Sequence, residues 1–103
     1  RSKVSTYVGD GTLSQAITGV GFSPVYVRIW EQETTVQEIS VVEATKNMID
    51  DDGPASVLIN ATSVRVELNK IIALGADGFT VNDAGTDAHP NKLNQIYNYL
   101  AIG

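Results

Sequence analysis

The feature that most constrains the fold of this chain is a set of short segments in which apolar and polar residues alternate. The clearest segment is residues 64–68, where Val64, Val66 and Leu68 are separated by Arg65 and Glu67. Alternation with a period of two is typical of a β-strand with one face in a core and the other in water. The pattern therefore predicts a strand whose valine and leucine side chains are buried.

Two further runs alternate in the same way. Residues 25–30 carry Val25, Val27 and Ile29 on one predicted strand face and Tyr26, Arg28 and Trp30 on the other. Residues 96–102 carry Ile96, Leu100 and Ile102 on one face and Tyr97, Tyr99 and Ala101 on the other. Shorter strands are predicted at residues 4–8, 13–18, 36–42, 56–59 and 78–81.

Turn-forming residues separate these runs at short intervals. The turns are Gly-Asp-Gly at residues 9–11 and Gly-Val-Gly at residues 19–21, and Asp52-Gly53-Pro54 ends another segment. Asp77-Gly78 predicts a two-residue hairpin turn, because both positions tolerate positive φ. Many short strands with such turns indicate one all-β domain over residues 1–103, a small antiparallel β-sandwich or barrel-like fold. At most one or two short helical turns are expected, within residues 43–51 and 87–94.

The composition excludes several classes of protein. The 103 residues include no cysteine, so there is no disulfide framework, thiolate nucleophile or zinc–thiolate site. Seven Lys and Arg residues against twelve Asp and Glu give a net charge of −5, and the basic residues are scattered, which argues against nucleic-acid binding. No apolar run approaches the roughly 20 residues of a membrane-spanning helix. We expect no cofactor and no membrane partner.

Candidate catalytic residues are few. His89 is the only histidine, so any Ser-His-Asp triad would have to use it. It precedes Pro90 in a polar stretch that resembles a loop, and the chain has no G-x-S-x-G segment to present a serine. We expect His89 to be a solvated loop residue, and we expect the protein not to be an enzyme.

Acidic residues form one dense cluster, which is the weak candidate for a metal site. Calcium prefers several carboxylate oxygens on a loop, and Asp50, Asp51 and Asp52 are the first place to seek them. The order of ligands in an EF-hand is absent, and adjacent carboxylates point in different directions. A solvated acidic turn is therefore the favoured interpretation. The same holds for the looser group Asp77, Asp83 and Asp87.

The aromatic residues are the best candidates for a ligand or subunit contact. Tyr26 and Trp30 share one strand face with Arg28 between them, and Tyr97 and Tyr99 share another. Such rings can belong to the core, anchor a subunit interface, where Tyr, Trp and Arg are enriched, or stack on sugar rings. The sequence leaves all three roles open.

The order of several motifs resembles a surface domain of tailed-bacteriophage particles. The chain has a Tyr-x-Gly-Asp-Gly-Thr turn at residues 7–12, an Ile-Thr-Gly-x-Gly-Phe-x-Pro segment at 17–24, an Asp-Gly-Phe-Thr hairpin at 77–80 and a similar terminal strand at 97–102. Residues 32–62 are unmatched. The family usually carries an acidic residue after the proline of the second motif, where this chain has Val25.

This resemblance implies a virion protein with no catalytic residues to transfer. We expect a non-enzymatic structural protein on the particle surface, most simply a head decoration or cement protein that contacts capsid or sister subunits. The alternative is a tail-fibre or tail-appendage module that binds host-surface glycan through Tyr26, Trp30, Tyr97 or Tyr99. A homo-oligomer is expected in either role, because association is a common way to cover an exposed sheet edge.

Overall fold

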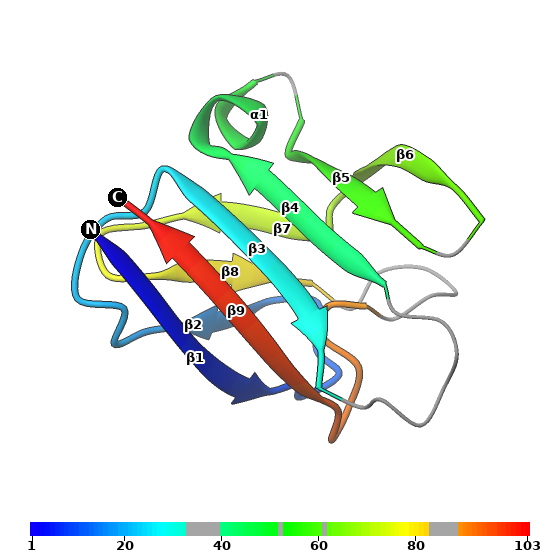
Figure 1. Ribbon diagram of the computed structural model, residues 1–103, viewed down its shortest axis with the longest axis horizontal. Coiled ribbons are helices and arrows are strands. Elements are labelled where there is room, and N and C mark those ends of the chain that lie inside the picture. The colour runs from blue at the N-terminus through cyan, green and yellow to red at the C-terminus, as the bar shows by residue number, and fades with distance from the viewer. Residues whose placement is uncertain (33–39, 52, 61, 83–88) are drawn as a thin grey trace.

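The structure is a computed structural model that describes residues 1–32, 40–51, 53–60, 62–82 and 89–103. In these residues nine strands form two antiparallel sheets, and one five-residue helix lies at their margin (Figure 1). A continuous hydrophobic core lies between the sheets. The prediction of a small all-β antiparallel domain, sandwich or barrel-like, with at most one or two short helical turns is confirmed, and the two sheets form a sandwich-like arrangement.

The larger sheet has six strands, and Figure 1 shows it in front of the smaller sheet of three. Its strands in spatial order are β1 (Ser2–Val8), β9 (Ile96–Ile102), β3 (Tyr26–Glu31), β4 (Val41–Thr45), β5 (Ala55–Ile59) and β6 (Val64–Leu68). The smaller sheet consists of β2 (Gln15–Ile17), β8 (Phe79–Val81) and β7 (Ile71–Leu74). The two chain ends lie side by side, because Arg1 and Gly103 exchange backbone hydrogen bonds of 3.0 Å.

Strand alternation selects the residues that fill the core. The larger sheet contributes every second residue of its central strands, including Val27, Ile29, Val42, Tyr97, Tyr99 and Ala101. The smaller sheet contributes Ile17, Ile71, Phe79 and Val81. Four of these core residues are aromatic, with Tyr7 included, and their rings pack in edge-on and stacked pairs. Val25 departs from the predicted face, because it precedes β3 and is half exposed.

The predicted burial of residues 64–68 is wrong. The strand forms as β6, but Val64, Val66 and Leu68 are 70%, 66% and 57% exposed. The reason is the register with β5, which places these three residues on the side of the larger sheet that faces away from the smaller sheet, while Arg65 and Glu67 take the inward side at the sheet edge. Alternation correctly identified the strand and could not say whether another layer lies against it.

The Asp77-Gly78 turn is longer than predicted. Four residues, 75–78, join β7 to β8, and Gly75 N–H donates to the Gly78 carbonyl at 2.8 Å. Gly78 is required by close packing, because a Cβ atom there would lie 1.8 Å from the Ile17 carbonyl oxygen. Strand β7 itself was not predicted, because its apolar run does not alternate and a bulge interrupts its pairing after Ile71.

The short helix α1 (Lys46–Asp50) falls within the stretch where a helical turn was expected. Thr45 caps it by accepting a hydrogen bond from Met48 N–H at 3.3 Å, and Ile49 is its buried residue. In the other candidate stretch, residues 89–94 form turns and residues 87–88 lie outside the described part of the chain. Residues 36–39 of the predicted strand 36–42 also lie outside it. No helix of the described residues is long and apolar enough to cross a membrane.

Candidate functional site

The outward surface of the larger sheet carries three of the five aromatic and arginine residues proposed as contacts. Tyr26, Arg28 and Trp30 alternate along β3 with the buried Val27 and Ile29, so all three point away from the core. We call the outward-pointing residues of the six strands the outer face. Tyr26 and Trp30 are half buried there by their strand neighbours, and Arg28 is exposed.

The outer face is unusually apolar for a surface in water. Seven of the large hydrophobic residues that are exposed belong to it: Val4, Val8, Val64, Val66, Leu68, Ile96 and Ile102. Strand β5 adds the partly buried Val57 and Ile59 beside β6. Exposed apolar patches larger than a few hundred Å² are rare on monomers and mark interaction sites. The outer face is therefore the candidate functional site.

The carboxylate of Glu43, at the middle of the outer face, contacts both Tyr26 and Arg28. The Tyr26 hydroxyl donates to Glu43 Oε2 at 2.6 Å, and Arg28 Nε lies 3.5 Å from the same oxygen. Burial and the hydrogen bond to Glu43 raise the pKa of Tyr26 to about 12. Glu43 was not a sequence candidate, because its place beside Arg28 depends on the pairing of β3 with β4.

Tyr97 and Tyr99 are not part of this surface. Their side chains point inward from β9 and are 0% and 3% exposed. Tyr97 stacks on Tyr7, with ring centroids 5.3 Å apart, and its hydroxyl accepts from Lys92 N–H at 3.1 Å. Burial raises the pKa of Tyr99. Of the three roles that the sequence leaves open for these two tyrosines, the structure shows the core, and the proposed contact with a ligand or subunit does not hold for them.

His89 is buried, and the prediction of a solvated histidine is wrong. Its side chain is 1% exposed and packs edge-on against Tyr97 with ring centroids 5.2 Å apart. Nδ1 lies 3.2 Å from Glu31 Oε1, yet neither ring nitrogen makes a well-aligned hydrogen bond within the described residues. A substrate cannot reach an imidazole in this position, so His89 is poorly placed to act as a general base.

The acidic candidates do not converge within the described part of the chain. Asp50 and Asp51 are exposed at the end of α1, where Asp50 pairs with Lys46 at 2.9 Å. Asp52, Asp83 and Asp87 lie outside the described residues. Among the residues that are described, no three Asp, Glu or His side chains gather in a way that would hold a metal ion.

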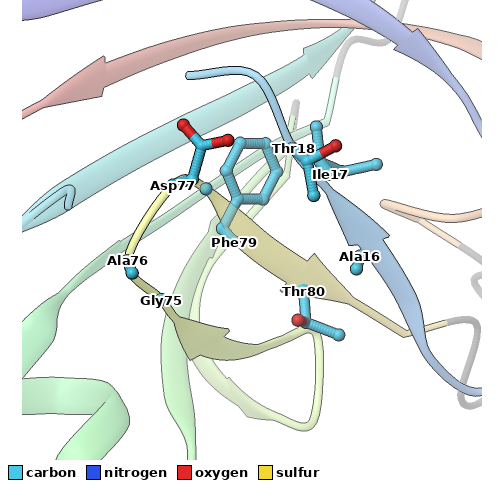
Figure 2. A pocket seen from close by; sticks show the side chains of 9 residues that line it. Ala16, Ile17, Thr18, Gly75, Ala76, Asp77, Phe79 and Thr80 are labelled. Atoms are coloured by element: carbon cyan, nitrogen blue, oxygen red, sulfur yellow. The ribbon is translucent and has the colours of Figure 1, made fainter. Parts of the chain in front are cut away.

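Asp77 has a structural role that the sequence did not indicate. Its two carboxylate oxygens accept hydrogen bonds from Gly19 N–H at 3.0 Å and Gly21 N–H at 2.7 Å. Figure 2 shows this corner, where Asp77 and Phe79 lie across from Ile17 and Thr18 and line a shallow pocket. These two backbone donors lower the pKa of Asp77. The carboxylate ties the β7–β8 connection to the loop after β2.

A second aspartate, Asp10, holds the loop that follows β1. Asp10 Oδ1 accepts from Thr12 N–H at 2.9 Å, from the Thr12 hydroxyl at 2.7 Å and from the buried Asn91 amide at 2.9 Å. The bonds from Thr12 and then that from Asn91 lower the pKa of Asp10. The aspartate of the Gly-Asp-Gly-Thr motif therefore holds its own loop in place and joins it to Asn91.

The lowered pKa of Asp77 predicts a specific dependence of stability on pH. A group whose folded pKa is depressed stabilises the fold above its unfolded pKa, and this stabilisation is lost as pH falls through the folded value. We expect Asp77→Asn to lower the melting temperature at pH 7. The asparagine side chain is uncharged, and it keeps only one of the two acceptor oxygens of the carboxylate. The melting temperatures of the native and variant proteins should converge as the pH falls below the unfolded pKa of about 3.9. A difference of constant size as the pH falls would contradict this role.

Comparison of the chain with protein-family models, with curated proteins and with solved structures found no match.

Proposed function

We propose that this chain is a non-enzymatic structural protein of a bacteriophage particle, exposed on the particle surface as a head decoration or cement protein. The observation that carries the proposal is the outer face, which presents Trp30, Tyr26 and Arg28 among exposed valine, leucine and isoleucine side chains. Centres of protein–protein interfaces are rich in Trp, Tyr and Arg and poor in other charged residues. The order of the phage-like motifs supports the particle as its location.

The rest of the described molecule agrees with a structural role. The single histidine is packed into the core, and the best-connected carboxylates, Asp10 and Asp77, are occupied by hydrogen bonds that hold loops together. Hydrogen bonds that hold loops in place in this way favour a rigid domain with fixed surfaces. Such a domain suits a protein whose work is to contact its neighbours.

Glycan binding by a tail appendage is the second candidate. It is favoured by the two aromatic residues, Tyr26 and Trp30, on one accessible strand face with Arg28 between them. Sugar sites also need polar groups around the stacking ring to bind the hydroxyl groups. Trp30 has the polar neighbours Asn98 and then Thr6 on one side only. On its other side the neighbours are Val41 and then Ile59, and protein contact fits this apolar side better.

The number of copies in a purified particle distinguishes the two roles. We expect quantitative mass spectrometry to find this chain in a number comparable to the major capsid protein. A count of a few to a few tens per particle would instead support the tail appendage, and absence from purified particles would overturn both. In the tail role, binding to a glycan array should be lost in Trp30→Ala and kept in Leu13→Ala, which alters an exposed residue outside the sheets.

A further inference from the structure

One row of residues across the outer face is symmetric in character about the middle of the sheet. The sheet order β1-β9-β3-β4-β5-β6 places the midline between β3 and β4. On that midline Arg28 and Glu43 are directly paired. The strand registers continue this pair into a row of six outward residues, in order Val4, Leu100, Arg28, Glu43, Val57 and Val66. The row has two apolar residues at each end and opposite charges at the centre.

A row of this kind is complementary to itself. Two sheets that stack face to face through a two-fold axis must have that axis in the plane between them. If the axis runs parallel to the strands along the midline, Arg28 of each copy lies over Glu43 of the other. The same axis brings Leu100 over Val57 and Val4 over Val66.

The charges also select this axis over the other possibility. An axis perpendicular to the strands would place Arg28 over Arg28 and Glu43 over Glu43, which repel each other. Of the described strand residues that point outward from this sheet, Arg28 and Glu43 are the only charged ones. Their opposite signs therefore decide the orientation of the partner.

The area of the outer face matches what a dimer requires. Neighbouring strands lie about 4.8 Å apart and each residue advances a strand by about 3.3 Å. Six strands of five to seven residues then cover roughly 500 Å² in projection, so two stacked faces bury about 1,000 Å² or more. Specific interfaces begin at about 1,000 Å² of total buried surface.

The edges of the sheet disfavour the other way of joining two copies. Charged side chains on the inward side of an edge strand prevent strand-by-strand addition. Both edges have them: Lys3 on β1, and Arg65 and Glu67 on β6, where Arg65 Nε lies 2.6 Å from Glu67 Oε1. The larger sheet is therefore protected from edge-to-edge pairing with a second copy, while its outer face remains free to stack on one.

We propose that the outer face binds a second copy of this chain, with the two larger sheets stacked about a two-fold axis parallel to the strands between β3 and β4. This inference rests on the proposed function for the use of the outer face in protein contact, and it names the partner and its orientation. The particle would then receive the protein as a preformed dimer.

The first experiment measures the mass of the purified protein by sedimentation equilibrium over a range of concentrations. We expect twice the mass of one chain, and we expect Val66→Lys to weaken the dimer by roughly 100-fold or more, because the change acts twice across the interface. Leu13→Lys is the matched control, because Leu13 is 70% exposed, close to the 66% of Val66, but lies outside the sheets, and this variant should remain dimeric. Equal weakening in both variants would overturn the proposal.

The second experiment tests whether Arg28 and Glu43 lie in the interface by exchanging their charges. Arg28→Glu places two acids on the midline and Glu43→Arg places two bases there, so neither variant should pair with itself. Mixed together, the two variants should form a heterodimer, because each acid then faces a base of the other chain. Mixing does not repair a defect within one chain, so the heterodimer separates the interface from folding, which circular dichroism checks for each variant.

Two results would overturn the dimer. One is a native protein that stays monomeric at every concentration, and the other is a mixture of charge variants that does not associate. If the protein is a monomer but is abundant in purified particles, the proposed function is still supported. The outer face would then bind the shell protein instead of a second copy. A dimer that is absent from purified particles would support the face-to-face dimer and overturn the proposed function.

Discussion

Replacing Gly78 by alanine is expected to destabilise the fold by about 3 kcal/mol or more, at the upper end of what overpacking costs. The added methyl group would lie 1.8 Å from the Ile17 carbonyl oxygen and 2.9 Å from its carbon. Both are backbone atoms of β2, which pairs with β8 beside this position, so they cannot rotate away as a side chain would. Urea denaturation followed by circular dichroism measures the loss.

Gly75 provides the matched control in the same connection. A Cβ atom there would meet nothing closer than the Gly78 carbonyl oxygen at 3.9 Å, and its backbone is not left-handed. Gly75→Ala should therefore be neutral or stabilise the protein by up to about 1 kcal/mol, because alanine reduces the entropy of the unfolded chain. A similar loss in both variants would show that the connection is intolerant in general, and the close approach of β2 would not be its cause.

The sequence predicted the strands far better than it predicted the faces they bury. Alternation located β3, β6 and β9, because the period of two follows from strand geometry alone. Burial depends on which layer lies against a strand, and that is set by contacts distant in sequence. Val66 and Tyr97 show the consequence, since the exposed valine was expected inside and the tyrosine was left open to a surface role.

The candidate site was predictable only along one strand. Tyr26, Arg28 and Trp30 share a face because they alternate on β3, and this needed no tertiary information. Glu43 lies beside Arg28 only through the register of β3 with β4, and no local pattern encodes that pairing. His89 was misplaced for the same reason, because its polar neighbours indicate a loop while the fold packs the ring against Tyr97.

The second large effect is expected at Tyr97, where the core and surface interpretations differ most. Its side chain is 0% exposed between Tyr7 and His89, so Tyr97→Ala opens a cavity in the aromatic core. We expect a loss of about 3–5 kcal/mol in the free energy of unfolding. Tyr97→Phe keeps the ring and removes only the hydroxyl that accepts from Lys92 N–H, so it should cost about 1 kcal/mol.

The matched control for this prediction is the tyrosine on the other side of the same sheet. Tyr26 points outward and is half buried, so Tyr26→Ala should cost the monomer about 1 kcal/mol, through the contact of its ring with neighbouring strands and its bond to Glu43. Both variants are best made in the Val66→Lys background, so that dissociation of a dimer does not contribute to the unfolding transition. Equal losses at the two tyrosines would mean that the outer face is covered even in the monomer. A small loss at Tyr97 would mean that this ring is not part of the core, because a residue that fills the space between two sheets cannot be truncated without leaving a cavity.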